Sequence, residues 1–385
     1  MHRYCLLTGA TGLLGRYLLR DLLLHEIPIA ALVRAERRCS AEQRLDVVHS
    51  YWERELKRRL PRPVCIEGEI THPDLGLSSA ARAWIGEHCS SIIHNAASLT
   101  FWGKDRSADP WLSNLTGTEN VLALCRATNI RNFHYMSTAY VCGQRDTPVL
   151  EEDFDCGQTF RNDYEHAKFE AEKRVRRAAA EWIDRLTVYR PGVIVGDSRT
   201  GYTSTYHGAY AYFQFAWLLV QYLPKGSDGL HFLPIRFNLT GAETHNFVPV
   251  DWVSACVTHL FRHPEHHGRT YHLTPTVMTT SRMLYDVMSE YFQFRGPTFD
   301  GPGALAAGDL NEIEKSFYEY VDRYQTYWLQ EPVFSRRNVE RALPHLPAPT
   351  IDFASLTRML DVAVKDNWGK KAKGVKVGDR QEMPS

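Results

Sequence analysis

The stretch "TGATGLLG", residues 8–15, decides how the rest of this chain is interpreted. Its glycines, Gly9, Gly12 and Gly15, recur every third residue, a spacing that many ordinary turns also show. The flanks give it weight. The apolar run "YCLL", residues 4–7, predicts a buried strand, and "LLGRYLLRDLLLH", residues 13–25, carries leucines at helical spacing.

The order strand, glycine turn, helix is typical of a dinucleotide site. In that order Gly9 allows the sharp turn, Gly12 lets a diphosphate approach the backbone, and Gly15 lets the helix lie against the strand. The helix N-terminus then faces the phosphates. A purely structural turn in an α/β protein is the alternative interpretation.

Strand-like and helix-like runs alternate over about the first 190 residues. The expected strands after the first are residues 29–33, 64–67, 91–97, 132–137 and 186–191, and the expected helices between them are residues 41–59, 78–88, 114–127 and 163–180. Such alternation predicts an α/β fold with a doubly wound parallel Rossmann sheet.

The chain is expected to divide into two parts and a tail. Residues 1–195, joined by residues 243–262, are expected to form the Rossmann domain. Residues 196–242 and 263–368 are expected to form a smaller, mostly helical C-terminal substrate lobe over the carboxyl ends of the strands, where open sheets bind substrates. The polar, lysine-rich residues 369–385 predict a disordered tail.

Composition excludes several classes of function. The 45 basic and 45 acidic residues give a formal charge of zero, which predicts no nucleic-acid partner and favours small-molecule chemistry. The eight cysteines contain no Cys-x-x-Cys pair, and no signal peptide precedes the first strand, so we expect a cytoplasmic protein with reduced thiols. The longest apolar run, residues 210–224, is too short for stable membrane insertion.

The histidine cluster "HPEHHG", residues 263–268, is the one stretch that resembles a metal site. No carboxylate or cysteine accompanies it at the spacing of a ligand set. We expect a solvated loop there and no bound metal.

The end of the second expected strand, "ALVRAERR" at residues 31–38, predicts which dinucleotide binds. An NAD site usually has a carboxylate here, whereas this chain has Arg34, followed by Arg37 and Arg38. A guanidinium suits a 2′-phosphate, which favours NADPH over NADH. Glu36 counts against this prediction, and a solvated basic helix start is the alternative for Arg37 and Arg38.

Two stretches carry the candidate chemistry: "YMSTAYVCG", residues 135–143, and "YEHAK", residues 164–168. Tyr164 and Lys168 are four residues apart and share one helix face. A phenol has a pKa of about 10, which a nearby ammonium lowers, making Tyr164 a usable general acid or base. The hydroxyl of Thr138 or Ser137 is expected to hold the substrate oxygen. A helical surface pair is the alternative for the tyrosine and lysine.

Taken together, these motifs resemble the extended short-chain dehydrogenase/reductase superfamily over roughly residues 4–368. The matching stretches also include "HNAA" (94–97), "NLTGT" (114–118), "YRPGVIVG" (189–196) and "HNFVPVDWV" (245–253). Within the superfamily, "LVRAERRCSAEQRL" (32–45) and "GEITHPDLGLS" (68–78) look most like the thioester reductases. That branch includes the terminal reductase domains of nonribosomal peptide synthetases and carboxylic acid reductases, and the related fatty acyl reductases.

The resemblance implies roles for individual residues. It makes Tyr164 the proton donor and Lys168 the residue that binds the nicotinamide ribose. By its spacing before "VCG", Thr138 rather than Ser137 is implied as the third catalytic residue. Asn114 matches an asparagine that supports this site.

The resemblance also implies the cofactor contacts. Arg34, with Arg44, matches the basic residues at the 2′-phosphate. Glu69 stands where the family usually has aspartate, which puts its expected contact with the adenine in question. The full implied cofactor-binding set is Thr8, Gly9, Thr11, Gly12, Leu13, Leu14, Gly15, Arg34, Arg44, Glu69, Ile70, Asn95, Ala96, Ala97, Tyr164, Lys168, Pro191 and Val193.

The implied activity is NADPH-dependent reductive release of an acyl thioester, bound to a carrier protein or to coenzyme A, as an aldehyde. Whether reduction continues to the alcohol stays open, as do the acyl group and the oligomeric state. The aromatic stretch at residues 202–217 is the expected wall of the acyl channel, with a plain packing helix as the alternative.

Two other functions stay open at this point. One is an NADP-dependent reductase or epimerase of a sugar-nucleotide, steroid or flavonoid carbonyl, because the same Thr, Tyr and Lys serve those reactions. The other is a non-catalytic regulator that senses NADPH. The chain has no room for an adenylation or carrier domain, so we expect a free-standing reductase rather than an excised terminal domain.

Overall fold

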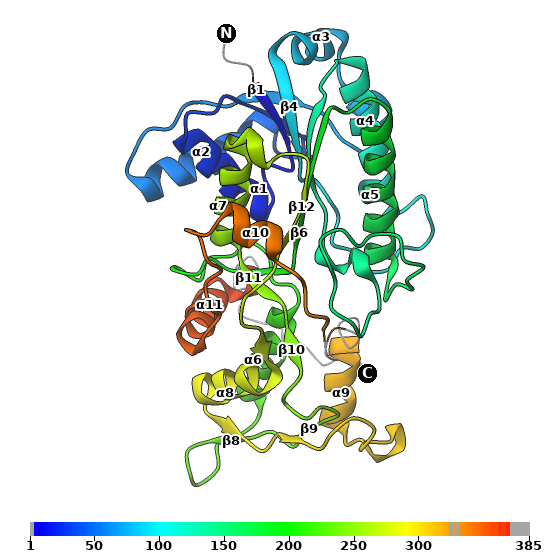
Figure 1. Ribbon diagram of the computed structural model, residues 1–385. Helices are drawn as coiled ribbons and strands as arrows, with labels where there is room; N and C mark the ends of the chain where they lie inside the picture. Colours follow the sequence, from blue (N-terminus) through cyan, green and yellow to red (C-terminus); the bar gives the residue numbers. More distant parts are fainter. Residues whose placement is uncertain (1–3, 323–326, 328–330, 370–385) are drawn as a thin grey trace.

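A seven-stranded parallel sheet forms the centre of the larger part of the molecule (Figure 1). The computed structural model describes residues 4–322, 327 and 331–369. The strand order is β12-β6-β5-β4-β1-β2-β3, and every neighbouring pair is parallel. The strands are β1 (Tyr4–Thr8), β2 (Ile29–Val33), β3 (Val64–Glu67), β4 (Cys89–His94), β5 (Asn132–Met136), β6 (Arg185–Pro191) and β12 (Thr270–Leu273).

The strand order confirms the predicted doubly wound fold. The chain builds outward from β1 in both directions, so the connections after β1 and β4 leave in opposite senses. That divergence opens a crevice at the carboxyl ends of these two neighbouring strands, which is where open α/β sheets bind ligands.

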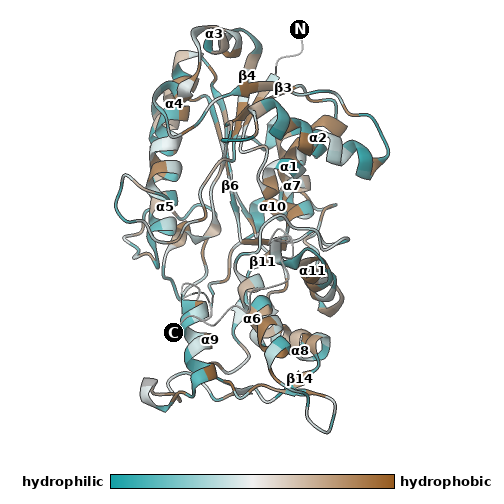
Figure 2. Cartoon of the chain, turned by 180° about the vertical axis from the view of Figure 1, so that it is seen from behind, coloured by the Kyte–Doolittle hydropathy of each residue, from teal (hydrophilic) through white to brown (hydrophobic). Residues whose placement is uncertain are grey.

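Helices cover both faces of the sheet (Figures 1 and 2). One layer holds α1 (Leu13–Leu24), α2 (Ala41–Leu56) and α7 (Val250–Arg262), and the other holds α3 (Ser79–His88), α4 (Gly117–Ala127) and α5 (Asp163–Glu181). Because both faces are covered, a strand such as β2, "IAALV", is buried at every position.

Local sequence signals explain where the helices begin and end. A capping box opens α2, since the Ser40 hydroxyl accepts from the Gln43 N–H and the Gln43 side chain accepts from the Ser40 N–H. The helix ends at Leu56, before the expected residue 59, because Lys57 adopts a left-handed conformation with φ of 49°. The Asn162 side chain caps α5 by accepting from the Glu165 N–H.

A smaller, mostly helical lobe lies beyond the carboxyl ends of the strands, in the lower half of Figure 1. Its helices are α6 (Ala209–Tyr222), α8 (Ser281–Phe292), α9 (Glu312–Val321) and α11 (Phe353–Lys365). Short strand pairs join them: β7 (Val193–Val195) with β11 (Phe247–Pro249), β8 (His231–Phe232) with β14 (Phe294–Arg295), β9 (Arg236–Phe237) with β15 (Thr298–Phe299), and β10 (Thr244–His245) with β13 (Thr279–Thr280). The lobe has its own core around Phe213, Val287 and Leu360.

The division of the chain differs from the expectation at one point. We expected residues 263–368 to belong to the lobe, yet β12 pairs with β6 at the edge of the main sheet, and α10 (Arg337–Ala342) packs against β12. The chain therefore returns to the sheet beyond residue 262. The four-residue run "TYHL" is too short to predict a strand without its neighbour. Of the expected tail, residues 370–385 lie outside the described residues.

Candidate active site

The glycine turn positions the N-terminus of α1 at the crevice. Gly9 has φ of +71°, and a Cβ there would lie 2.8 Å from the Ala96 backbone. A Cβ on Gly15 would lie 1.8 Å from the Gly9 carbonyl oxygen, so helix and turn touch directly. A Cβ on Gly12 would meet the Gly9 oxygen at an ordinary 3.5 Å. Packing therefore requires glycine at positions 9 and 15. At position 12 there is room for a Cβ, and the residue lines the cavity.

A buried hydrogen-bond chain fixes the loop after β4. Thr118 donates to the Asn114 carbonyl oxygen (2.6 Å), so its oxygen accepts from His94 Nε2 (3.1 Å). His94 Nδ1 then accepts from the Thr8 hydroxyl (2.8 Å), whose oxygen in turn accepts from the N–H groups of Asn95 and Ala96 (3.1 and 3.0 Å). Burial lowers the pKa of His94 to about 3, with a contribution from Lys168, which keeps the ring neutral as this chain requires.

One cavity of about 1160 Å³ runs from the glycine turn to the lobe. It brings together nearly all the residues that the sequence indicated as site residues. The predicted residues that line it are Gly9, Thr11, Gly12, Leu13, Leu14, Arg34, Arg44, Glu69, Ile70, Asn95, Ala96, Ala97, Thr138, Tyr164, Lys168, Pro191 and Val193.

Three predicted residues lie behind the cavity wall. The Thr8 hydroxyl is fully committed to His94 and the loop, and Gly15 is pressed against Gly9. Asn114, 1% exposed, holds the loop backbone, because its side chain donates to the Ser98 carbonyl (3.0 Å) and accepts from the Ser98 N–H (2.7 Å). These residues shape the site from outside it.

The structure distinguishes the two neighbouring hydroxyls after β5. The Ser137 hydroxyl donates to the buried Glu172 carboxylate at 2.5 Å. The Thr138 hydroxyl accepts from the Tyr140 N–H (3.4 Å), and its hydrogen bonding to Tyr164 lowers the pKa of that phenol. Ser137, Thr138 and Tyr164 all line the cavity. The preference for Thr138 over Ser137 as the third catalytic residue stays a prediction.

Lys168 lies one helical turn beyond Tyr164 and is 3% exposed. Its ammonium donates to the Met136 carbonyl oxygen (2.7 Å) and lies 4.5 Å from the centre of the Tyr135 ring. Burial lowers the pKa of Lys168 to about 7, although the Glu172 carboxylate opposes that shift.

The pKa of Tyr164 differs from the expectation. We expected the ammonium to lower it, but burial raises it to about 12; the hydrogen bond with Thr138 works against that rise, and the charge of Glu165 adds to it. The physical reason is that the Lys168 ammonium is turned to Met136 and the Tyr135 ring on the sheet. Tyr164 is thus a protonated phenol at neutral pH, a group that can give up a proton.

Two guanidiniums line the cavity at the end beyond β2 and β3. Arg34 lies 3.3 Å from the Glu69 carboxylate, and Arg44 lies 2.9 Å from that of Glu36. Arg44 also donates to the Arg34 carbonyl oxygen (2.7 Å), which ties the two together. The Glu69 carboxylate, which contacts Arg34, also lines the cavity, and its contact with the adenine stays a prediction.

Arg37 and Arg38 occupy a different place. Both are exposed, in the turn between β2 and α2, and lie outside the residues that line the cavity. That arrangement matches the solvated alternative for this pair.

The cavity also has walls that sequence reasoning missed. The loop after β4 is fastened to α5, since the Tyr164 N–H donates to the Phe101 carbonyl (3.2 Å) and the Phe101 and Tyr164 rings lie 6.1 Å apart. Glu331 accepts from the Tyr140 hydroxyl (2.6 Å) and the Asn246 side chain (2.9 Å). No spacing in the sequence joins these residues, which come from five distant segments.

The end of the cavity inside the lobe is rich in aromatic and apolar side chains, with His245, Glu319 and Asp322 also on its wall. Its lining includes Tyr210, Tyr212, Phe237, Phe247, Leu284, Tyr285, Met288 and Phe299. Residues 202–217 contribute Tyr210 and Tyr212, while Tyr202 stacks on Tyr51 away from the cavity. Part of the predicted channel wall therefore lines the cavity, and part packs elsewhere.

None of the helices in the described part of the chain is both long and apolar enough to cross a membrane. His263 and His266 stack with His259, whose ring also lies 4.6 Å from that of His345. Within the described residues no group of three or more potential ligands has the arrangement to hold a metal ion.

Comparison with known proteins identifies relatives. The NAD-binding family described as "Male sterility protein" matches residues 7–257. "Nonribosomal peptide synthetase asaC" of Aspergillus flavus is 28% identical over 285 residues, which cover 70% of this chain and 26% of that protein. The chain spans 4–36% of the length of the curated relatives that it matches.

Solved structures of reductase domains from peptide synthetase systems are similar to this chain. The terminal R domain from the myxalamid PKS-NRPS biosynthetic pathway is 25% identical, with a TM-score of 0.76, covering 95% of this chain and 91% of that one. A thiolation-reductase di-domain from an archaeal non-ribosomal peptide synthetase is similar in fold, with 19% identity and a TM-score of 0.70 over 96% of this chain and 77% of that one. The protein is an oxidoreductase that uses a nicotinamide cofactor.

The different surroundings of Gly15 and Gly12 predict that one added methyl group will affect stability at the first position and nucleotide binding at the second. Gly15→Ala should lower the free energy of unfolding by about 1–3 kcal/mol or more, because its Cβ collides with backbone. Gly12→Ala should change it by less than about 1 kcal/mol but weaken nucleotide binding. Chemical denaturation and nucleotide fluorescence titration measure the two effects. Equal loss of stability in both variants would contradict this assignment.

Proposed function

Because the chain belongs to the NAD-binding family described as "Male sterility protein", in the thioester reductase branch of the extended short-chain dehydrogenase/reductases, we propose that it reduces an acyl thioester to an aldehyde with NADPH. The observation that carries this proposal is that Tyr164 and Thr138 face a single cavity. That cavity joins the glycine turn at one end to an aromatic lobe at the other.

The residues at the glycine turn fit the cofactor. The first N–H groups of α1 lack helical partners by geometry, and the first turn of α1, all of it described, contains no acidic residue to compete with a diphosphate. Gly12 leaves the backbone open to a phosphate, and Leu13 and Leu14 line the same wall. Lys168 would hold the nicotinamide ribose, and Arg34 with Arg44 the 2′-phosphate.

The chemistry follows from the arrangement of the hydroxyls. A bound NADPH supplies the hydride. Thr138 and Tyr164 would hydrogen-bond the thioester oxygen as negative charge develops on it. Tyr164, protonated because its pKa is about 12, would then give its proton to that oxygen, and the resulting hemithioacetal would release a thiol and an aldehyde.

The aromatic end of the cavity supports an acyl group as the substrate. Apolar side chains there would bury a carbon chain, which a sugar nucleotide would not offer. Leu99 and Trp102 line the cavity and are 51% and 58% exposed, which is typical of a mouth through which a tethered substrate enters. We infer that the thioester arrives on a carrier protein or coenzyme A, in line with the synthetases among the relatives.

An assay with thioesters tests the reaction. The protein is incubated with NADPH and a panel of acyl-coenzyme A and acyl-pantetheine thioesters, while NADPH oxidation, released thiol and trapped aldehyde are measured. We expect the three to match one to one, and oxidation at twice the thiol would indicate reduction to the alcohol. NADPH-dependent reduction of a ketone or sugar carbonyl, without thioester turnover, would overturn the proposal.

Substitution of the hydroxyls tests their roles. Tyr164→Phe should lower kcat about 10²–10⁴-fold with nucleotide binding retained, because the proton donor is lost. Thr138→Ala should lower it about 10²–10³-fold. Ser137→Ala, the matched control, should cost about fivefold or less, since its hydroxyl is bound to Glu172. If Ser137→Ala lost more activity than Thr138→Ala, the assignment of Thr138 would be wrong.

The cofactor preference has its own test. Arg34→Ala should raise the Kd for NADPH about tenfold and leave that for NADH unchanged, because one charged hydrogen bond to the 2′-phosphate is lost. Arg37→Ala, three residues away and outside the cavity, is the control and should change neither. Fluorescence titration with both nucleotides measures the ratio. An unchanged NADPH/NADH ratio in Arg34→Ala would remove Arg34 from this role.

A further inference from the structure

The carboxylate of Glu172 is the most highly coordinated charged group near the proposed site. It lies on α5, is 0% exposed, and accepts from Ser137 (2.5 Å), from Arg176 Nε and Nη2 (2.8 and 2.7 Å) and from Arg190 Nε and Nη2 (3.2 and 2.7 Å). The two guanidiniums come from different elements, α5 and β6. A carboxylate with this many donors is fixed in position and charge.

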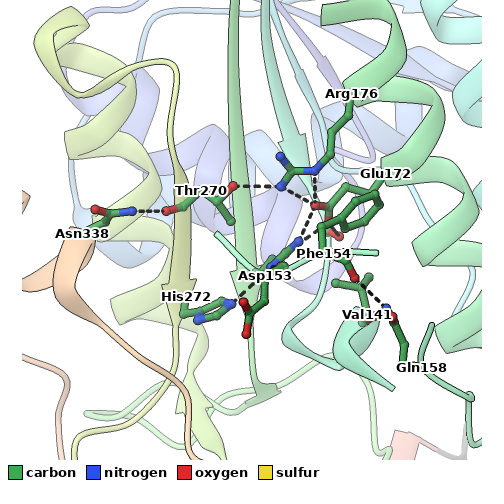
Figure 3. Close-up of polar contacts among 11 residues, drawn as sticks. Val141, Asp153, Phe154, Gln158, Glu172, Arg176, Thr270, His272 and Asn338 are labelled. Atoms are coloured by element: carbon green, nitrogen blue, oxygen red, sulfur yellow. Dashed lines mark hydrogen bonds and ion pairs between the residues drawn. The ribbon is translucent and has the colours of Figure 1, made fainter. Parts of the chain in front are cut away.

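Neighbouring residues hold this cluster in place, as Figure 3 shows. Arg176 reaches from α5 both to Glu172 and to the Thr270 hydroxyl on β12 (2.9 Å). Arg190 donates to the Asp153 carbonyl oxygen (2.8 Å). Burial alone would raise the pKa of Glu172, but the charges of Arg190 and Arg176 lower it to about 2, so the group stays ionised at working pH.

Lys168 stands one helical turn before Glu172 and lines the cavity, and its ammonium donates to the carbonyl oxygen of Met136 (2.7 Å), the residue next to Ser137. The titratable and charged groups around it are His94 on β4, Tyr135 on β5, Tyr164 and Glu172 on α5, and Arg190 on β6, beyond the Glu172 carboxylate. His94 is neutral, and the pKa of Tyr135 is raised by burial, so Glu172 is the anion of this group. Burial disfavours the ammonium, and the charge of Glu172 favours it.

The same carboxylate orients Ser137. By accepting a hydrogen bond from Ser137 it turns that hydroxyl towards α5, whereas the adjacent Thr138 hydroxyl affects the pKa of Tyr164. One buried anion thus affects two parts of the proposed machinery: Lys168 on its own helix and the Ser137 hydroxyl at the end of β5.

We propose that Glu172 is a positioning residue that keeps Lys168 cationic for nicotinamide-ribose binding and holds Ser137 away from the substrate oxygen. The proposal rests on the cofactor role given to Lys168 above. This role is distinct from stabilising the fold. If the ion pairs of Glu172 with Arg176 and Arg190 only stabilised the fold, removing the Glu172 charge would leave the pKa of Lys168 unchanged.

The decisive measurement is the Kd for NADPH as a function of pH, without substrate, in the wild-type protein and Glu172→Gln. In the wild type, affinity should fall as the pH rises through about 7, because Lys168 loses its proton. Glu172→Gln removes the anion at nearly constant shape, so the midpoint should move down by about one pH unit. Above both midpoints the Kd should then be about tenfold weaker than in the wild type, and below both it should be nearly equal.

Three further variants separate charge from structure. Glu151→Gln removes another buried carboxylate at the same sheet edge, which accepts from the N–H groups of His272 and Asn338, and should leave the midpoint unchanged. Glu172→Asp keeps the charge and should restore the midpoint even where stability falls. Arg176→Gln removes one neutralising cation from the carboxylate, so the midpoint should move up, the opposite direction to Glu172→Gln.

These results decide the proposal whatever the substrate is. Opposite shifts in Glu172→Gln and Arg176→Gln, with none in Glu151→Gln, would support it even if no thioester were reduced, in which case the proposed reaction alone would fail. Superimposed pH profiles with reduced melting temperature would overturn it. If Glu172→Gln did not fold, Arg176→Gln, whose side chain is 32% exposed, would still decide, since an unshifted midpoint contradicts the proposal.

Discussion

The contact between the turn after β1 and the first turn of α1 is the constraint on which the site depends. With no side chain at Gly15, the helix backbone touches the Gly9 carbonyl, and with none at Gly9, the turn touches Ala96 after β4. The two carboxyl ends at the centre of the sheet are thereby locked together. The helix N-terminus points into the crevice between them, where an anion gains from the unpaired N–H groups.

Buried polar groups extend this order from the glycine turn to Tyr164. The Thr8, His94 and Thr118 chain fixes the loop after β4, and that loop is fastened to the start of α5 at Tyr164. Each of the hydroxyl and imidazole donors in this series of hydrogen bonds, Thr8, His94 and Thr118, has an acceptor, which avoids the cost of an unpaired polar group. A single arrangement of the loop is therefore favoured, and it holds the cavity wall next to the phenol of Tyr164.

The electrostatics of the site follow from burial rather than from net charge. The pKa of Tyr164 is raised and that of Lys168 is lowered for the same reason, since each loses the solvation of its charged form. A phenol that stays protonated suits a reduction, in which a proton must be given. A buried lysine with a pKa near neutrality needs an anion such as Glu172 to remain charged, and the guanidiniums keep that anion ionised.

The sequence by itself determined the features encoded locally. Glycine spacing next to a strand and a helix predicted the turn, and four-residue spacing on a helix placed Tyr164 and Lys168 on one face. Tertiary structure decided the rest, because it depends on pairs far apart in the chain. Ser137 meets Glu172, 35 residues away, β12 finds its place only beside β6, and Arg34 meets Glu69. Spacing in the sequence does not encode burial or long-range partners. The raised pKa of Tyr164 and the different partners of Ser137 and Thr138 therefore follow only from the tertiary structure, which brings these segments together.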